Sequence, residues 1–157
     1  MVKLRAPALL RRELESLRWR PQALMMSGAT DCYQPAERHF RLTRQCLKVL
    51  EDLWNPVGLI TKNALVARDR DLLGKMARWQ GAMVSLTITT LDAELSGKLE
   101  PRAARPEHRL RTLRLLTEAG IPTGVMIAPV IPGLTEHEIP AILDAAAAAR
   151  CHPCFGT

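Results

Sequence analysis

The sequence of 157 residues has no long apolar segment. None of its apolar runs approaches the roughly 20 residues that a membrane-crossing helix requires, so we expect no membrane partner. The basic start at residues 1–5 is not followed by the apolar stretch of a secretory signal. We therefore expect a cytoplasmic protein.

The sequence has no framework of evenly spaced cysteine pairs. The four cysteines are Cys32, Cys46, Cys151 and Cys154. Such usage excludes a disulfide scaffold and favours a reducing compartment. The last two have the spacing of a metal or redox site, but one Cys-x-x-Cys without a second pair is a weak zinc signal. The four histidines form no convincing catalytic set with a serine and an acid.

The composition that is present is that of an ordinary globular domain. Hydrophobic residues make up 47% and charged residues 24% of the chain. The length suffices for one domain with a core of its own. The net charge of +6 has two interpretations, a set of solvated helix faces or a surface that meets nucleic acid.

Strand-like runs alternate with helical periodicity along the chain. The strands are predicted at residues 23–27, 57–61, 83–89 and 123–131. Helices precede the first strand, at residues 7–17, and follow each of the four. Gly120 and Pro122 mark the end of the helix before the last strand. This order predicts an α/β fold with parallel strands joined by right-handed crossovers.

Two architectures fit that order, an open doubly wound sheet and a partial β/α (TIM-like) barrel. In the third strand Ser85, Thr87 and Thr89 alternate with apolar residues, which gives one apolar and one hydroxyl-bearing face. A polar barrel lumen explains this pattern, and so does a half-exposed edge strand. Both architectures stay open on these residues. In either, we predict about four parallel strands with flanking helices over residues 1–149, followed by an irregular tail at 150–157.

Parallel α/β folds bind ligands at the carboxyl ends of their strands. Here those ends are rich in hydroxyl, amide, glycine and proline residues, which suit a ribose or an amino-acid head group. They lie at residues 27–31, 61–63, 87–92 and 129–133. Lys62 can form a Schiff base there if it is desolvated, or contact a phosphate or carboxylate. Asp92 is predicted to cap a helix, and Thr135 with Glu138 to form a capping box.

Five short motifs occur in order along the chain. They are 30–38 (TDCYQPAER), 56–63 (PVGLITKN), 85–92 (SLTITTLD), 99–104 (LEPRAA), and 118–122 (EAGIP) continuing into 128–134 (APVIPGL). Together they resemble a bacterial radical S-adenosylmethionine (SAM) family that is similar to spore photoproduct lyase. Residues 6–14 (APALLRREL) resemble the helix that follows the cluster loop of that family. The resemblance extends to about residue 149.

The resemblance implies a six-stranded partial barrel, a [4Fe-4S] cluster and SAM. In the family a Cys-x-x-x-Cys-x-x-Cys loop holds the cluster, and SAM chelates its fourth iron. An electron from the cluster cleaves SAM to methionine and a 5′-deoxyadenosyl radical, which abstracts hydrogen from the substrate. The cofactor carries this chemistry, and the protein binds and orients it.

By position, the resemblance also implies a cofactor site. Its residues are Ser27, Gly28, Thr30, Asp31, Thr61, Lys62, Ser85, Thr87, Pro129 and Ile131. The first four correspond to the methionine amino group, the two on the third predicted strand to the ribose and carboxylate, and the last two to the adenine pocket. Thr61 and Lys62 are expected to face the same lumen.

One departure from the family pattern is plain, because the sequence contains no Cys-x-x-x-Cys-x-x-Cys. We therefore expect a fragment of a radical SAM enzyme, lyase-like in ancestry and inactive by itself, with no metal ligands of its own. Two alternatives stay open, a different barrel lyase that uses Lys62 and a non-enzymatic α/β binding domain with nucleic acid as a partner.

Overall fold

A computed structural model describes residues 2–27, 30–149 and 152–153. One parallel sheet has the order β1-β2-β3-β4-β5. Its strands are β1 (Leu24–Met26), β2 (Val57–Thr61), β3 (Ala82–Thr87), β4 (Thr123–Met126) and β5 (His152–Pro153). The α-helices are α1 (Ala6–Leu14), α2 (Glu37–Phe40), α3 (Leu42–Asp52), α4 (Arg70–Ala77), α5 (Ala93–Leu99), α6 (Pro106–Glu118) and α7 (Ile139–Ala148), with 3₁₀ turns η1 (Ala64–Asp69) and η2 (Glu136–Glu138).

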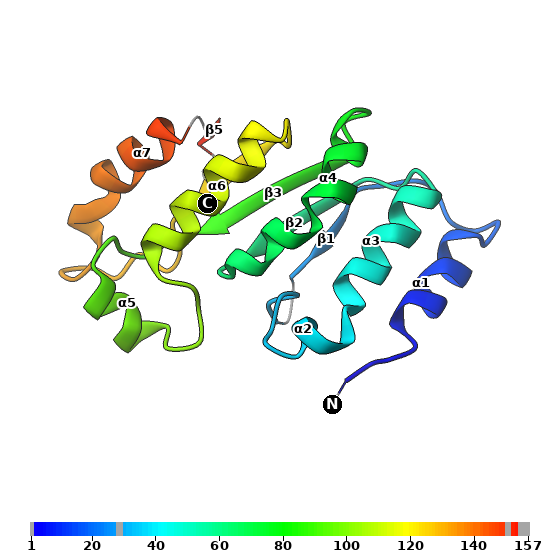
Figure 1. Ribbon diagram of the computed structural model, residues 1–157, viewed down its shortest axis with the longest axis horizontal. Helices are drawn as coiled ribbons and strands as arrows, with labels where there is room; N and C mark the ends of the chain where they lie inside the picture. Colours follow the sequence, from blue (N-terminus) through cyan, green and yellow to red (C-terminus); the bar gives the residue numbers. More distant parts are fainter. Residues whose placement is uncertain (1, 28–29, 150–151, 154–157) are drawn as a thin grey trace.

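The strand order identifies the sheet as part of a barrel. Neighbours in the sheet are neighbours in sequence, so right-handed crossovers place the connecting helices on one face. Figure 1 shows these helices lying together over that face. A doubly wound sheet would reverse its order and carry helices on both faces. The predicted partial β/α barrel with flanking helices is therefore confirmed, and two residues of the tail add the short strand β5.

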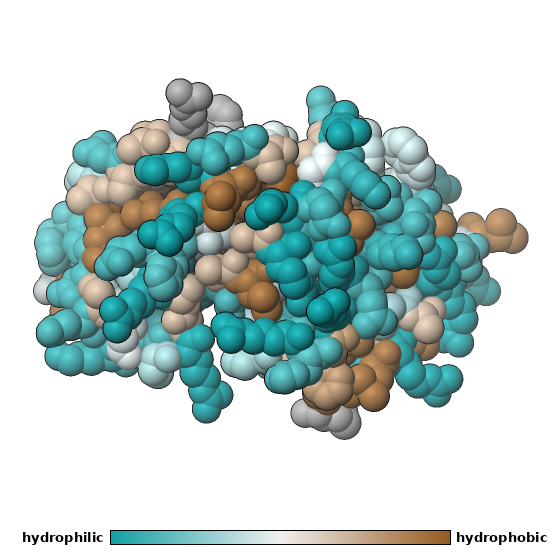
Figure 2. Space-filling model, in the orientation of Figure 1, coloured by the Kyte–Doolittle hydropathy of each residue, from teal (hydrophilic) through white to brown (hydrophobic). Residues whose placement is uncertain are grey.

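The core lies between the sheet and the helices. Leu47 and Leu50 of α3, with Leu73 of α4, are fully buried against the sheet. Leu113 and Leu116 of α6 continue this layer. Each such side chain stabilises the fold by roughly 1.5–3 kcal/mol through burial. The outer surface of the helices is predominantly hydrophilic (Figure 2), and no helix in the described part of the chain has the length and apolarity to cross a membrane.

The opposite face of the sheet carries mixed side chains. One row of this face consists of Met25, Gly58 and Met83, and the next of Ile60, Ser85 and Gly124. Met25 is 60% and Met83 39% exposed. Because side chains alternate along a strand, the hydroxyl-bearing face of β3 points away from the helices, as a barrel lumen requires.

Two sequence predictions were wrong near the carboxyl end. The last long strand ends at Met126 rather than at residue 131, since Pro129 and Pro132 lack the amide hydrogens that a sheet ladder needs. The capping box does not form. Thr135 instead accepts a hydrogen bond from the amide of Ile131 at 2.9 Å. The predicted cap at Asp92 is confirmed, because its carboxylate accepts from the amides of residues 94 and 95.

Tryptophans gather at the amino ends of the strands. Trp54 precedes β2 and Trp79 precedes β3, with ring centroids 5.3 Å apart. The indole of Trp19 donates to the buried side chain of Asn55 at 3.0 Å. Aromatic and amide contacts therefore stabilise this end of the sheet. The polar residues predicted for a site lie at the opposite, carboxyl ends of the strands.

Candidate functional site

Three of the sequence motifs converge at the carboxyl ends of β1 and β2. They surround a pocket of about 500 Å³. Its lining residues are Asp31, Tyr33, Gln34, Pro35, Lys62, Asn63, Glu100, Pro101, Arg102 and Ala103. Segments some 30 and 70 positions apart thus form one cavity because parallel strands end on the same side of a sheet.

Asp31 ties the loop after β1 to the end of β2. The hydroxyl of Thr61 lies 2.7 Å from Oδ1 and 2.9 Å from Oδ2, and the amide of Lys62 donates to Oδ2 at 2.9 Å. The amide of Tyr33 donates to Oδ1 at 2.8 Å. The carboxylate is thereby engaged by donors of the chain itself and fixes the wall of the pocket.

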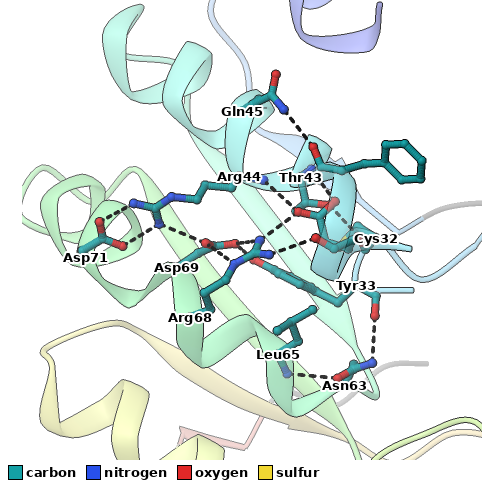
Figure 3. Close-up of polar contacts among 12 residues, drawn as sticks. Cys32, Tyr33, Thr43, Arg44, Gln45, Asn63, Leu65, Arg68, Asp69 and Asp71 are labelled. Atoms are coloured by element: carbon teal, nitrogen blue, oxygen red, sulfur yellow. Dashed lines mark hydrogen bonds and ion pairs between the residues drawn. The ribbon is translucent and has the colours of Figure 1, made fainter. Parts of the chain in front are cut away.

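A network of ion pairs also holds the loop after β1 in place (Figure 3). Arg68 bonds the carboxylates of Glu37 and Asp69 at 2.7–2.9 Å. Arg44 bonds Asp69 at 3.0 Å and Asp71 at 2.7–2.8 Å. The buried Tyr33 donates its hydroxyl to Asp69 at 3.1 Å, and burial followed by the Asp69 charge raises its pKa. Residues 33–44 are thus anchored to η1 and α4.

Glu100 lies between two cations at the ends of β2 and β3. Its Oε1 accepts from the ammonium of Lys62 and from the Thr89 hydroxyl at 2.8 Å. Its Oε2 accepts from Arg109 at 2.6 Å. Desolvation by burial acts to raise the pKa of Glu100, but the hydrogen bonds from Lys62, Arg109 and Thr89 outweigh it, and the pKa lies below its ordinary value.

Glu138 forms a third polar contact at a strand end. Its carboxylate accepts from the Thr90 hydroxyl and, at 2.7 Å, from the amide of Leu91. It therefore connects the start of α7 to the loop after β3, in place of the capping role predicted from its spacing.

The residues predicted to bind a cofactor are only partly brought together. Asp31 and Lys62 line the pocket, and Thr61 contacts Asp31. Ser85 and Thr87 lie on β3 and are 7% and 3% exposed. Pro129 and Ile131 occupy the loop after β4 and not the strand itself. Of the first segment, Ser27 is half-buried, Thr30 is exposed, and Gly28 lies outside the described residues.

Three polar residues of this region were not predicted as site residues, namely Glu100, Arg109 and Glu138. Arg109 had a readable signal, since it lies one helical turn before Leu113 and shares its buried stripe on α6. An arginine in an apolar stripe requires buried acceptors. Glu100 lay within a recognised motif, but its partners come from distant strands.

The described cysteines do not fit an iron–sulfur cluster. Cys32 donates to the Met26 carbonyl at 3.7 Å, and its pKa is raised to about 12, chiefly by desolvation. Burial raises the pKa of Cys46 to about 11. A cluster ligand has to be a thiolate. Cys151 and Cys154 lie outside the described residues, and within the described ones no three His, Cys, Asp or Glu side chains could hold a metal.

The strand ends carry hydrogen-bond donors of two kinds. The ammonium of Lys62 can pair with an anion, and the hydroxyls of Ser85 and Thr87 can bond other polar groups. Lys62 is engaged in an ion pair with Glu100, and a Schiff base at its Nζ would have to break that contact. This contact therefore argues against the lyase alternative.

Comparisons with known proteins give one family. Residues 2–146 match the Radical SAM superfamily. An uncharacterized protein of Mycobacterium tuberculosis is 32% identical over 136 residues, which are 87% of this chain and 40% of the relative. One from Methanocaldococcus jannaschii is 36% identical over 115 residues, 73% of this chain and 43% of the relative. The chain thus spans about two fifths of the length of these relatives.

Two solved structures share the fold at 16% identity. Streptococcus suis SuiB bound to S-adenosylmethionine matches 98% of this chain and 32% of its own, with a TM-score of 0.63. Spore photoproduct lyase complexed with dinucleoside spore photoproduct matches 94% of this chain and 42% of its own, with a TM-score of 0.65.

Proposed function

The chain belongs to the radical SAM superfamily, and from this premise we propose that the carboxyl ends of its strands bind SAM. The observation that carries the proposal is the convergence of three motif segments on one pocket at those ends, with Lys62 in its wall. Ligand sites of β/α folds lie at this end of the sheet.

The chain offers a partner for each polar part of SAM. Lys62 would hold the carboxylate, and Ser85 with Thr87 the ribose hydroxyls. Ser27 and Thr30 would approach the amino group, and backbone near Pro129 and Ile131 the adenine. Asp31 and Thr61 serve this site indirectly, because the hydrogen bond between them fixes the loop after β1, which would approach the amino group of SAM. Bound SAM would supply a sulfonium that is cleaved on reduction.

The superfamily also implies a [4Fe-4S] cluster. Cys32 is half-buried and Cys46 is buried, burial raises the pKa of both thiols, and the described part of the chain groups no three potential metal ligands. On this basis we propose that this chain alone assembles no cluster and does not turn over. The radical reaction would then belong to a longer protein that contains the cluster cysteines.

Nucleic acid is the second candidate ligand. The net charge of +6 favours a polyanion, and the spore photoproduct lyase structure contains a dinucleoside spore photoproduct. For the longer protein we therefore propose a lyase reaction with a DNA lesion as the substrate class.

SAM binding is tested by titrating SAM into the ¹⁵N-labelled chain and following its amide resonances. We expect the shifts to centre on residues 61–63 and 87–90. Lys62→Met should weaken binding about tenfold or more, since a charged hydrogen bond contributes roughly 1.5–3 kcal/mol. Lys98→Met, at an exposed position of α5, is the matched control and should bind as wild type. No shifts at millimolar SAM would refute the proposal.

Cluster assembly is tested by anaerobic reconstitution with iron and sulfide. We expect well under one iron per chain and no thiolate–iron absorption. About four irons per chain would contradict the proposal and make Cys32, Cys151 and Cys154 the first residues to replace.

A further inference from the structure

The main chain of Lys62 is fixed on two sides. Its amide donates to Asp31 at 2.9 Å, and its carbonyl accepts from the amide of Ala104 at 3.2 Å. Its side chain is different, because four rotatable methylenes separate the ammonium from this anchor. The side chain is one third exposed, and Glu100 is its ion-pair partner. Glu100 therefore determines where the ammonium points.

Glu100 is itself held in place by Arg109. This arginine is 1% exposed, and all three of its guanidinium nitrogens donate hydrogen bonds. They reach the Glu100 carboxylate at 2.6 Å, the Thr87 carbonyl at 2.8 Å and the Ala104 carbonyl at 2.6 Å. A planar guanidinium bonded in three directions cannot rotate. The carboxylate is thus fixed relative to the end of β3.

The three charged groups form a unit with one net positive charge, two cations sharing a single carboxylate. The unit still attracts an anion at the pocket, where Lys62 and Glu100 are both part of the wall. Arg109 is buried behind Glu100, so the accessible cation of the unit is Lys62.

We propose that Glu100 is a positioning residue that holds the Lys62 ammonium where it meets the carboxylate of bound SAM. The inference rests on the proposed SAM site and adds a residue to it. The geometry removes most of the rotational freedom of the lysine before the ligand arrives, which lowers the entropic cost of binding.

Glu100→Gln distinguishes positioning from charge balance. If Glu100 positions Lys62, the variant binds SAM roughly five- to tenfold more weakly, because a rotamer-rich side chain must be ordered on binding. If Glu100 only offsets charge, the variant has one more positive charge and binds SAM more tightly. Tighter or unchanged binding overturns the proposal. Unchanged binding that still depends on Lys62 overturns this inference alone, whereas a wild-type chain that binds no SAM overturns the SAM site with it.

A double-mutant cycle separates this role from a structural one. In the Lys62→Met background, Glu100→Gln should have little further effect on SAM affinity, because Glu100 acts through Lys62. An equal loss in both backgrounds would indicate general damage to the site and overturn the proposal.

The wild-type chain gives a third measurement that needs no Glu100 variant to fold. With ¹⁵N-labelled lysine, the Lys62 ammonium should give an Nζ resonance near neutral pH because the ion pair slows its proton exchange with water. The resonance is assigned by its loss in Lys62→Met. Addition of SAM should shift it. Lys98, which is exposed, supplies the reference for a freely exchanging ammonium. A Lys62 signal as exchange-broadened as that of Lys98 would rule out the positioning role.

Discussion

At the scale of single residues, three carboxylates lie at the ends of the strands, on Asp31, Glu100 and Glu138. Each accepts two or more hydrogen bonds from the chain and joins a loop or helix to a strand end. Buried carboxylates need such donors, because desolvation without them is costly. A polar residue at a strand end is therefore not by itself a ligand contact. Two of the three carboxylates hold Lys62, Asp31 by its amide and Glu100 by its ammonium.

The pH dependence of stability should reveal the ion pair of Asp71. The hydrogen bond from Arg44, opposed by partial desolvation, lowers its pKa from 3.8 to about 2. A depressed folded-state pKa adds stability above the unfolded-state value, and that stability is lost as the pH falls from about 4 towards 2. Asp71 is 54% exposed, so screening keeps the effect well under about 1 kcal/mol.

Urea unfolding at several pH values measures this effect. Asp71→Asn should be slightly less stable than wild type at pH 5, and the difference should shrink by pH 3. Asp144→Asn, at an exposed position of α7, serves as the control and should track wild type throughout. A difference for Asp71→Asn that stays constant from pH 5 to 3 would exclude the ion pair as its cause.

At the scale of elements, the sequence predicted correctly those strand and helix boundaries that depend on local periodicity. The strand at residues 57–61 was placed correctly, and so was the end of α6, where Gly120 adopts a φ of 73°. Contacts made across the fold were missed. The pairing of Glu138 with Thr90 and of Glu100 with Lys62 joins residues 48 and 38 positions apart, which no spacing rule links. The motifs identified the segments of the site but not their bonds.

Two glycines, one in a connecting loop and one in a helix, should respond oppositely to replacement by alanine. At Gly81, between α4 and β3, a Cβ would lie 2.0 Å from the Trp79 ring, so Gly81→Ala should destabilise the fold by about 1–3 kcal/mol. At Gly97 of α5 no atom beyond its neighbours in the chain and the adjacent helix backbone lies within 4 Å of the added carbon. Gly97→Ala should stabilise by up to about 1 kcal/mol, because alanine restricts the unfolded chain and favours the helix.

Urea denaturation followed by far-ultraviolet circular dichroism compares the two variants directly. Each is the control for the other, since both replace a hydrogen by a methyl group. Shifts of the same sign would contradict the packing described around Trp79.

At the scale of the whole molecule, the net charge of +6 bears on the nucleic-acid candidate. If DNA binds through phosphate contacts, the logarithm of the affinity should fall linearly with the logarithm of salt concentration, with a slope of about −0.9 per contact. Fluorescence anisotropy of a labelled duplex between 50 and 200 mM salt would measure it. The expected slope is several units. A slope near zero, or no binding at 50 mM, would leave the charge as a solvated surface and remove nucleic acid as a ligand of this chain.

The tryptophan fluorescence of the molecule comes from one end of the sheet only. All three tryptophans lie at the amino ends of the strands, where Trp19 contacts Asn55 and the rings of Trp54 and Trp79 lie 5.3 Å apart. The pocket with Lys62 lies at the opposite ends. Intrinsic emission should therefore report whether the chain is folded and stay constant while a ligand fills the pocket. Intrinsic tryptophan emission therefore measures the folding of every site variant, Glu100→Gln included, independently of ligand binding.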